Sequence, residues 1–101
     1  MREVRMNMVK VEGKNKKHVV QVYALSTCPH CMATKQFLRE EDIEFEYIDV
    51  DLCDKKELAQ IMNDIKRRGS SLSFPKIIID GKLVITGLDR EKIKEALKSN
   101  S

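Results

Sequence analysis

Two cysteines stand two residues apart in the stretch STCPHC (residues 26–31), and this pair constrains the chain more than any other feature. Cys28 and Cys31 could supply half of a zinc site, form a structural disulfide or exchange electrons with a substrate. The chain has three cysteines among its 101 residues, an odd number that argues against a disulfide framework. The chemistry of the pair therefore depends on what surrounds it.

The expected cellular compartment narrows the choice among these roles of the cysteine pair. No apolar run reaches the roughly 18 to 20 residues needed to cross a bilayer, and MREVRMNMVKVEG at the start lacks the apolar stretch of a secretory signal. We therefore expect a cytoplasmic, monomeric protein with no membrane partner. Cytoplasmic thiols are kept reduced, so a close pair is more often catalytic or metal-binding than structural.

The charge pattern gives little support for a nucleic-acid partner. The net charge is +3, and the basic clusters KNKK (residues 14–17) and KRR (residues 66–68) fit solvated turns and helix ends. The chain has no Trp, two Tyr and three Phe, too few for a surface on which bases could stack. We expect no nucleic acid among its partners.

The elements around the cysteines alternate between strand and helix. HVVQVYAL (residues 18–25) and FEYIDVD (residues 45–51) have the composition of strands. A helix begins at Cys28, with Cys31, Phe37 and Leu38 on its inner face and Lys35, Gln36, Arg39 and Glu40 opposite. DKKELAQIMNDIKRRG (residues 54–69) predicts a second helix that ends at Gly69 and has an apolar stripe of Leu58, Ile61, Met62 and Ile65.

The second half of the chain reads as a hairpin and a helix. PKIII (residues 75–79) and KLVIT (residues 82–86) flank an Asp80-Gly81 turn, which suits a tight hairpin. A last helix follows Asp89, its expected cap, and buries Ile93, Ala96 and Leu97. The predicted fold is α/β, in the order β-α-β-α-β-β-α around a four-stranded mixed sheet.

Residues 18–98 resemble a glutaredoxin, a small member of the thioredoxin fold. The resemblance rests on C-P-x-C at a strand-to-helix junction, a lone proline opening the third strand, and IDGK followed by a glycine. It implies a thiol-disulfide oxidoreductase that reduces protein disulfides. We divide the chain into an N-terminal extension (residues 1–17) and a glutaredoxin-like domain (residues 18–101).

The extension has two interpretations. Val4, Met6 and Met8 alternate with polar residues like a half-buried strand, and EGKNKK (residues 12–17) resembles a turn. The segment is either disordered or an extra strand at the sheet edge beside residues 45–51.

The positions of the two cysteines predict different roles. A helix N-terminus lowers the pKa of a cysteine there, so Cys28 is the expected nucleophile. Cys31, one turn further on, faces the core and can attack Cys28 once Cys28 is joined to a substrate. Pro29 suits the first helical position, and His30 can place a positive charge near Cys28 where most glutaredoxins carry Tyr.

The resemblance also implies a substrate surface. It places Pro75 after a cis peptide bond and against the cysteine pair, with Phe74 offering its backbone to an extended thiol substrate. The remaining substrate-binding positions that it implies are Thr27, Gly87, Leu88 and Asp89, although Asp89 serves equally well as a helix cap.

Glutathione is expected to bind weakly. Glutaredoxins that bind it usually carry Lys three positions before the first cysteine and Thr-Val before the cis-proline, where this chain has Leu25 and Ser73-Phe74. With the apolar Leu88, the chain resembles instead the glutaredoxin-like redoxins that serve ribonucleotide reductase and accept electrons from thioredoxin-type reductases. We expect no cofactor beyond the redox-active Cys28-Cys31 disulfide, with such a reductase or glutathione as electron donor.

Metal binding is the alternative function. A structural zinc site usually needs four ligands, and beyond the pair only Cys53, His18 and His30 remain, so no metal site is expected. An iron-sulfur cluster shared between two chains, with a further thiol such as glutathione, stays open as a carrier role for the same cysteines. Cys53 reads as a surface or half-buried cysteine without a regulatory role.

Overall fold

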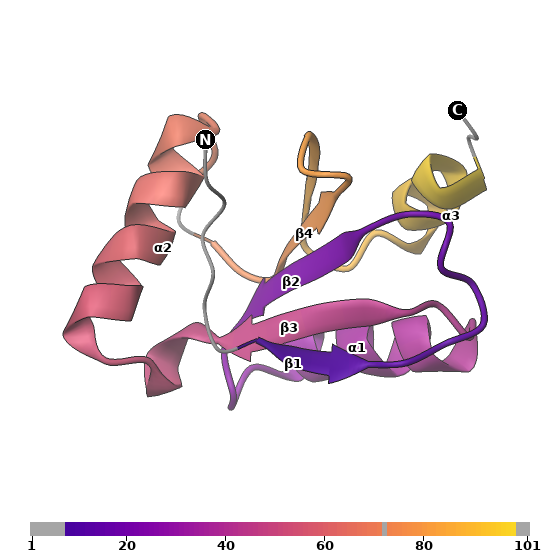
Figure 1. The fold of residues 1–101 in the computed structure, drawn as a ribbon, viewed down its shortest axis with the longest axis horizontal. Helices are drawn as coiled ribbons and strands as arrows, with labels where there is room; N and C mark the ends of the chain where they lie inside the picture. The colour runs from indigo at the N-terminus through magenta and orange to yellow at the C-terminus, as the bar shows by residue number, and fades with distance from the viewer. Residues whose placement is uncertain (1–7, 72, 99–101) are drawn as a thin grey trace.

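The computed structural model describes residues 8–71 and 73–98, whose strands form a five-stranded sheet in the order β1-β3-β2-β4-β5 (Figure 1). The strands are β1 (Val9–Val11), β2 (Val20–Ala24), β3 (Phe45–Asp49), β4 (Lys76–Ile79) and β5 (Leu83–Thr86). β2 pairs in parallel with β3 and antiparallel with β4, so the strand that leads into the cysteines is central. The predicted order of elements is confirmed.

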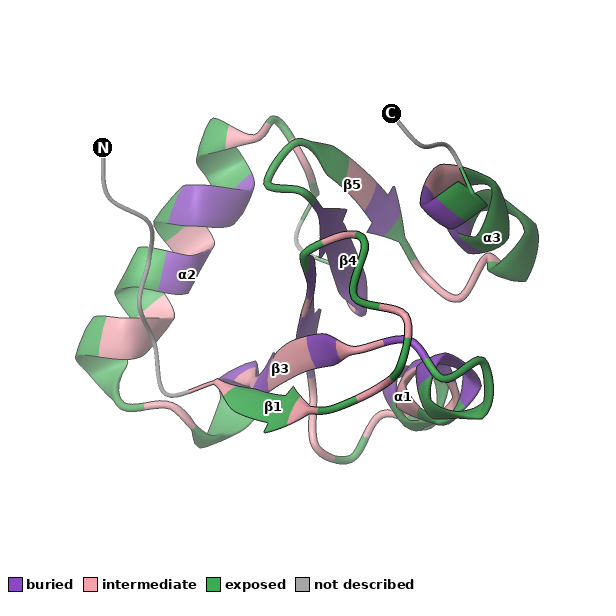
Figure 2. Ribbon diagram, turned by 45° about the vertical axis from the view of Figure 1, so that its right-hand side comes forward, coloured by how far each residue is buried: buried purple, intermediate pink, exposed green. Residues whose placement is uncertain are grey.

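Helices cover both faces of this sheet. They are α1 (Pro29–Glu40), α2 (Lys55–Arg67) and α3 (Arg90–Lys98), with a short 3-10 helix, η1 (Val50–Leu52), before α2. α1 and α3 pack on one face and α2 on the other, as the separate core clusters and Figure 2 both indicate. In the described part of the chain, no helix combines the length and apolar character needed to span a bilayer.

The predicted burial holds for most of the helical positions. Cys31, Phe37 and Leu38 are buried on α1, as are Ile61 and Ile65 on α2. Three positions that were predicted to face the core are only half-buried, namely Leu58, Met62 and Ala96.

Two of the predicted strands are shorter than the sequence suggested. β2 begins at Val20, and Val19 before it is 60% exposed, with its amide donating to the Asp80 side chain at 2.9 Å. β3 ends at Asp49, and the next residues turn into η1 instead of continuing the strand. The chain therefore turns away from the sheet directly after the carboxyl end of β3, on the side where the cysteines lie.

The extra edge strand is present, but later in the chain than the alternation suggested. β1 pairs antiparallel with β3, with Val9 opposite Tyr47. Met8 precedes the strand, and Val4 and Met6 lie outside the described residues. The strand adds at the predicted edge of the sheet.

The connection from β1 to β2 packs against the start of β3. The amide of Asn15 donates to the carbonyl of Asp42 at 2.9 Å, and the amide of Glu44 donates to the carbonyl of Asn15 at 3.0 Å. Gly13 approaches the backbone so closely that a Cβ there would lie 2.7 Å from the Asp42 oxygen. A glycine is therefore required at this crossing.

The expected turn and cap are confirmed. Asp80 and Gly81 both have positive φ, 54° and 70°, and the amide of Lys82 donates to the carbonyl of Ile79 at 3.1 Å. Gly69 follows the end of α2 with a φ of 72°. Asp89 accepts a hydrogen bond from the amide of Lys92 at 3.1 Å, so it caps α3.

Candidate active site

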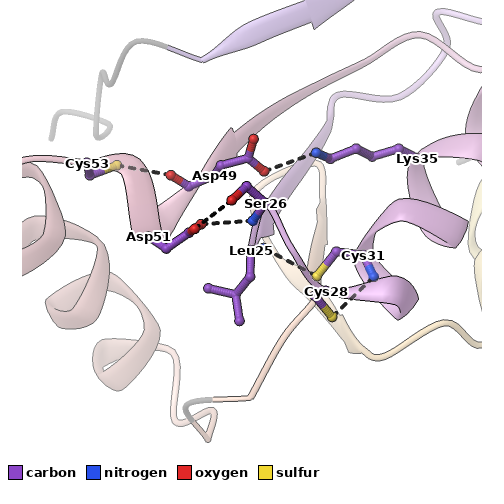
Figure 3. A network of polar contacts seen from close by, with 8 residues as sticks. All are labelled: Leu25, Ser26, Cys28, Cys31, Lys35, Asp49, Asp51 and Cys53. Carbon is purple, nitrogen blue, oxygen red and sulfur yellow. Dashed lines mark hydrogen bonds and ion pairs between the residues drawn. The ribbon is translucent and has the colours of Figure 1, made fainter.

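Cys28 occupies the N-cap of α1, where the first amides of the helix point toward its side chain. Its backbone is extended, with φ −87° and ψ 121°, and Pro29 is the first helical residue. The Sγ of Cys28 accepts a hydrogen bond from the amide of Cys31 at 3.4 Å (Figure 3). The half-buried thiol thus lies at the positive end of the helix dipole, as the sequence predicted.

This position stabilises the thiolate of Cys28. The pKa of Cys28 lies below the ordinary thiol value because its sulfur accepts hydrogen bonds from the Cys31 thiol, then from the Cys31 amide, and also from the His30 amide. Burial opposes the shift without cancelling it. The His30 side chain is exposed, and the effect of its charge on Cys28 stays a prediction.

Cys31 has the opposite environment. It is fully buried, and its Sγ accepts a hydrogen bond from the amide of Leu25 at 3.3 Å. Burial, together with the neighbouring Cys28, raises the pKa of Cys31 to about 11. The two thiols therefore differ in both access and ionisation.

This difference predicts the order of alkylation. Iodoacetamide should modify Cys28 at neutral pH, with an onset below the usual thiol range, whereas Cys31 should react slowly until the pH approaches about 11. Peptide mass spectrometry after timed labelling at a series of pH values measures both rates. Equal labelling of Cys28 and Cys31 at neutral pH would contradict the assigned difference.

A carboxylate anchors the turn that precedes Cys28. Asp51 accepts hydrogen bonds from the amide of Ser26 at 2.8 Å and from its hydroxyl at 2.6 Å (Figure 3). The hydroxyl bond and the amide bond hold the pKa of Asp51 below its usual value. The short helix η1, which follows β3, is thereby fixed to the active-site turn, in which Thr27 is exposed.

Pro75 follows a cis peptide bond from Phe74, as the resemblance implied. Its carbonyl accepts a hydrogen bond from the amide of Gly87 at 2.9 Å, which joins the start of β4 to the end of β5. Phe74 and Leu88 are half-buried and pack, as Cys28 does, against the core cluster that contains Cys31. Of the predicted substrate-binding residues, Gly87 and Asp89 both have structural roles, Gly87 through this hydrogen bond to Pro75 and Asp89 as the cap of α3.

The prediction that Lys35 lies on the outer face of α1 is wrong. Its side chain is only 13% exposed, and its ammonium group lies 3.0 Å from Oδ1 of Asp49 on β3 (Figure 3). The same nitrogen lies 3.9 Å from the centre of the Tyr47 ring. The helical pattern is read from apolar residues alone. It therefore does not predict that a lysine packs inward against a carboxylate and an aromatic ring on a neighbouring strand.

The buried carboxylate of Asp64 was also not predicted from the sequence. Asp64 on α2 is 3% exposed and accepts hydrogen bonds from the Tyr23 hydroxyl, Arg67 and Arg68 at 2.8, 2.6 and 3.0 Å. Burial alone would raise the pKa of Asp64, but these three donors outweigh it and hold the pKa below the usual value. The network joins α2 to β2 two residues before Leu25.

Cys53 lies apart from the pair, after η1. Its thiol donates to the carbonyl of Asp49 at 3.6 Å (Figure 3), and burial followed by the Glu57 and Asp54 charges raises its pKa. Among residues 8–71 and 73–98, no group of three or more His, Cys, Asp and Glu side chains is arranged to hold a metal ion.

The sheet topology, the cysteine pair at the start of α1 and the cis-proline define a redoxin with the thioredoxin fold. The family model described as Glutaredoxin matches residues 20–84. The chain therefore belongs to the glutaredoxin family, whose members are generally thiol-disulfide oxidoreductases.

Solved structures agree with this assignment. A glutaredoxin from Methanosarcina mazei Go1 is 33% identical, with a TM-score of 0.82 over 89% of this chain and 86% of that one. Methanoredoxin from Methanosarcina acetivorans is 32% identical, also with a TM-score of 0.82, over 94% of this chain and 98% of that one. Both likenesses include nearly the whole described fold.

Two sequence relatives match over a smaller share of this chain. An uncharacterised glutaredoxin-like protein in a rubredoxin operon of Clostridium pasteurianum is 26% identical over 79% of this chain and 99% of that protein. Glutaredoxin 1 from Rickettsia conorii is 33% identical, but the match covers 62% of this chain and 59% of that protein.

Proposed function

We propose that the protein reduces protein disulfides in the cytoplasm by a two-cysteine exchange. The observation that carries this proposal is the contrast between the two thiols: Cys28 is half-buried with a lowered pKa, and Cys31 is fully buried with a pKa of about 11. A nucleophile that is the more accessible and the more readily ionised of two thiols, next to a buried thiol with a raised pKa, suits attack followed by resolution.

The thiol-disulfide exchange has two steps. The Cys28 thiolate attacks a substrate disulfide, which forms a Cys28-substrate disulfide and releases the other substrate sulfur as a thiolate that takes up a proton. Cys31 then loses its proton and attacks the Sγ of Cys28, so that the Cys28-Cys31 disulfide forms and the second substrate thiol leaves. Two electrons pass to the substrate, and a donor must return them.

Catalysis of peptide disulfide reduction tests this function. In the presence of dithiothreitol as electron donor, catalytic amounts of the protein should accelerate reduction of a fluorescently labelled peptide disulfide. No acceleration over dithiothreitol alone would reject the proposal. A brown colour in the purified protein would favour the iron-sulfur alternative instead.

A protein reductase is the proposed electron donor, and ribonucleotide reductase is one candidate substrate. Leu25 stands where glutathione-binding relatives carry a lysine, and Arg67 and Arg68, which could supply another cation, are both engaged with Asp64. A hydrogen bond from a cation to a carboxylate contributes about 1.5 to 3 kcal/mol, so its loss weakens glutathione binding by about one to two orders of magnitude.

The donor prediction is tested by competition between two reductants. The oxidised protein should be reduced rapidly by a thioredoxin-type reductase with NADPH, and slowly by millimolar glutathione. Free thiols are counted at timed intervals in both reactions, and a Leu25→Lys variant serves as the control in which glutathione should become faster. Rapid reduction of the parent by glutathione alone would overturn this choice of donor.

A further inference from the structure

Lys35 is held in one place on the helix that carries Cys31. It lies one helical turn after Cys31 on α1, so both side chains project from the same side of the helix. The ion pair with Asp49 and the Tyr47 ring fix its ammonium group, and the Lys35 and Asp49 side chains are only 13% and 18% exposed. A cation with little water around it acts on its neighbours more strongly than a mobile surface cation.

We propose that Lys35 is a positioning residue for the second step of the exchange, in which its fixed charge favours the thiolate of Cys31. The inference rests on the proposed two-cysteine mechanism and adds to it the group that prepares the resolving thiol. The ion pair with Asp49 (Figure 3) and the contact with the Tyr47 ring hold Lys35 in this position.

Cys31 needs such a group because only a thiolate attacks a disulfide. With a pKa of about 11 in the free dithiol, Cys31 is a thiolate in about one molecule in 10,000 at pH 7. When Cys28 is joined to a substrate it carries no charge, so its repulsion of a Cys31 thiolate is gone. Burial still disfavours the thiolate, and the Leu25 amide and the Lys35 charge are left to favour it.

Other charged groups around Lys35 act in the opposite direction. Asp49 on β3 pairs with Lys35, and Asp51 on η1 has its pKa lowered in part by the Lys35 charge. Both carboxylates disfavour a nearby thiolate, and Cys28 at the start of α1 does so only while it is itself a thiolate. Without Lys35, the hydrogen bond from the Leu25 amide is left to favour a thiolate at Cys31.

Reaction with 5,5′-dithiobis(2-nitrobenzoate) separates the two steps. In a Cys53→Ser background, attack by Cys28 releases one equivalent of the coloured thiolate, and attack by Cys31 releases a second. For Lys35→Met, we expect an unchanged first phase and a second phase about tenfold slower at pH 7, with its pH midpoint about one unit higher. Lys35→Arg should keep the parent's second phase, because it keeps the charge.

The pH profile distinguishes a charge effect from a damaged fold. A charge effect moves the midpoint of the second phase and leaves its high-pH plateau unchanged, whereas a structural defect lowers the rate at every pH. Arg39→Met is the matched control, because it removes one exposed positive charge from the same helix and should change neither phase.

An unmoved midpoint in Lys35→Met, or equal slowing in Arg39→Met, would overturn the role of Lys35. Failure of the two-cysteine mechanism itself looks different, because the parent would then release no second equivalent at any pH.

Discussion

Replacing Cys28 with serine should reduce disulfide turnover to the uncatalysed rate while the fold stays intact. The hydroxyl of serine cannot ionise near neutral pH, so the helix N-terminus and the amide of Cys31 would have no nucleophile to activate. Turnover of the labelled peptide disulfide measures the loss, and thermal unfolding checks the fold.

Cys53→Ser is the control for this substitution. It also removes one thiol, but Cys53 lies after η1, where its thiol donates a hydrogen bond to the Asp49 carbonyl. Its turnover should stay close to that of the parent. A large loss in Cys53→Ser with normal stability would show that the third thiol takes part in the reaction, and residual turnover in Cys28→Ser would assign the attack to another cysteine.

Replacing Asp64 with alanine should lower the free energy of unfolding by about 3 kcal/mol. The substitution deprives the buried Tyr23 hydroxyl of its acceptor and leaves Arg67 and Arg68 without their carboxylate. Urea denaturation monitored by circular dichroism measures the change. Both guanidinium groups can reach water, which limits the cost below that of a fully enclosed ion pair.

Asp64→Asn is the matched control, since it keeps the shape and one acceptor for Tyr23 but loses the charge. We expect about half the destabilisation of the alanine variant. Because the folded-state pKa of Asp64 is depressed, its contribution is present above the unfolded value, about pH 4, and is lost as the pH falls through the folded value. An alanine variant as stable as the parent would show that the network contributes nothing net.

The features predicted well from sequence are those set by local chemistry. Cys28 followed by Pro29 defines the start of α1, because the cap and the first helical position are neighbours in the chain. Asp80 and Gly81 likewise specify the hairpin turn through their own backbone angles. The family resemblance supplied the cis bond before Pro75, which composition alone does not indicate.

The features that were missed depend on contacts between distant segments. Lys35 and Asp64 carry charges that a periodicity argument assigns to solvent, yet their partners lie 14 and 41 residues away at Asp49 and Tyr23. The position of β1 was shifted for a related reason, because its register depends on pairing with β3 and on the close packing of Gly13. In each case the information lies in the assembled sheet.

The intact mass of a Cys31→Ser variant after exposure to a disulfide peptide tests the central claim most directly. With the resolving thiol removed, Cys28 should hold the peptide half as a stable mixed disulfide, one adduct per chain, which dithiothreitol removes and which peptide mapping locates at Cys28. The same experiment with the parent should give the Cys28-Cys31 disulfide and no lasting adduct. A Cys31→Ser protein that captures no peptide, or carries it on Cys53, would contradict the assigned roles of the two cysteines.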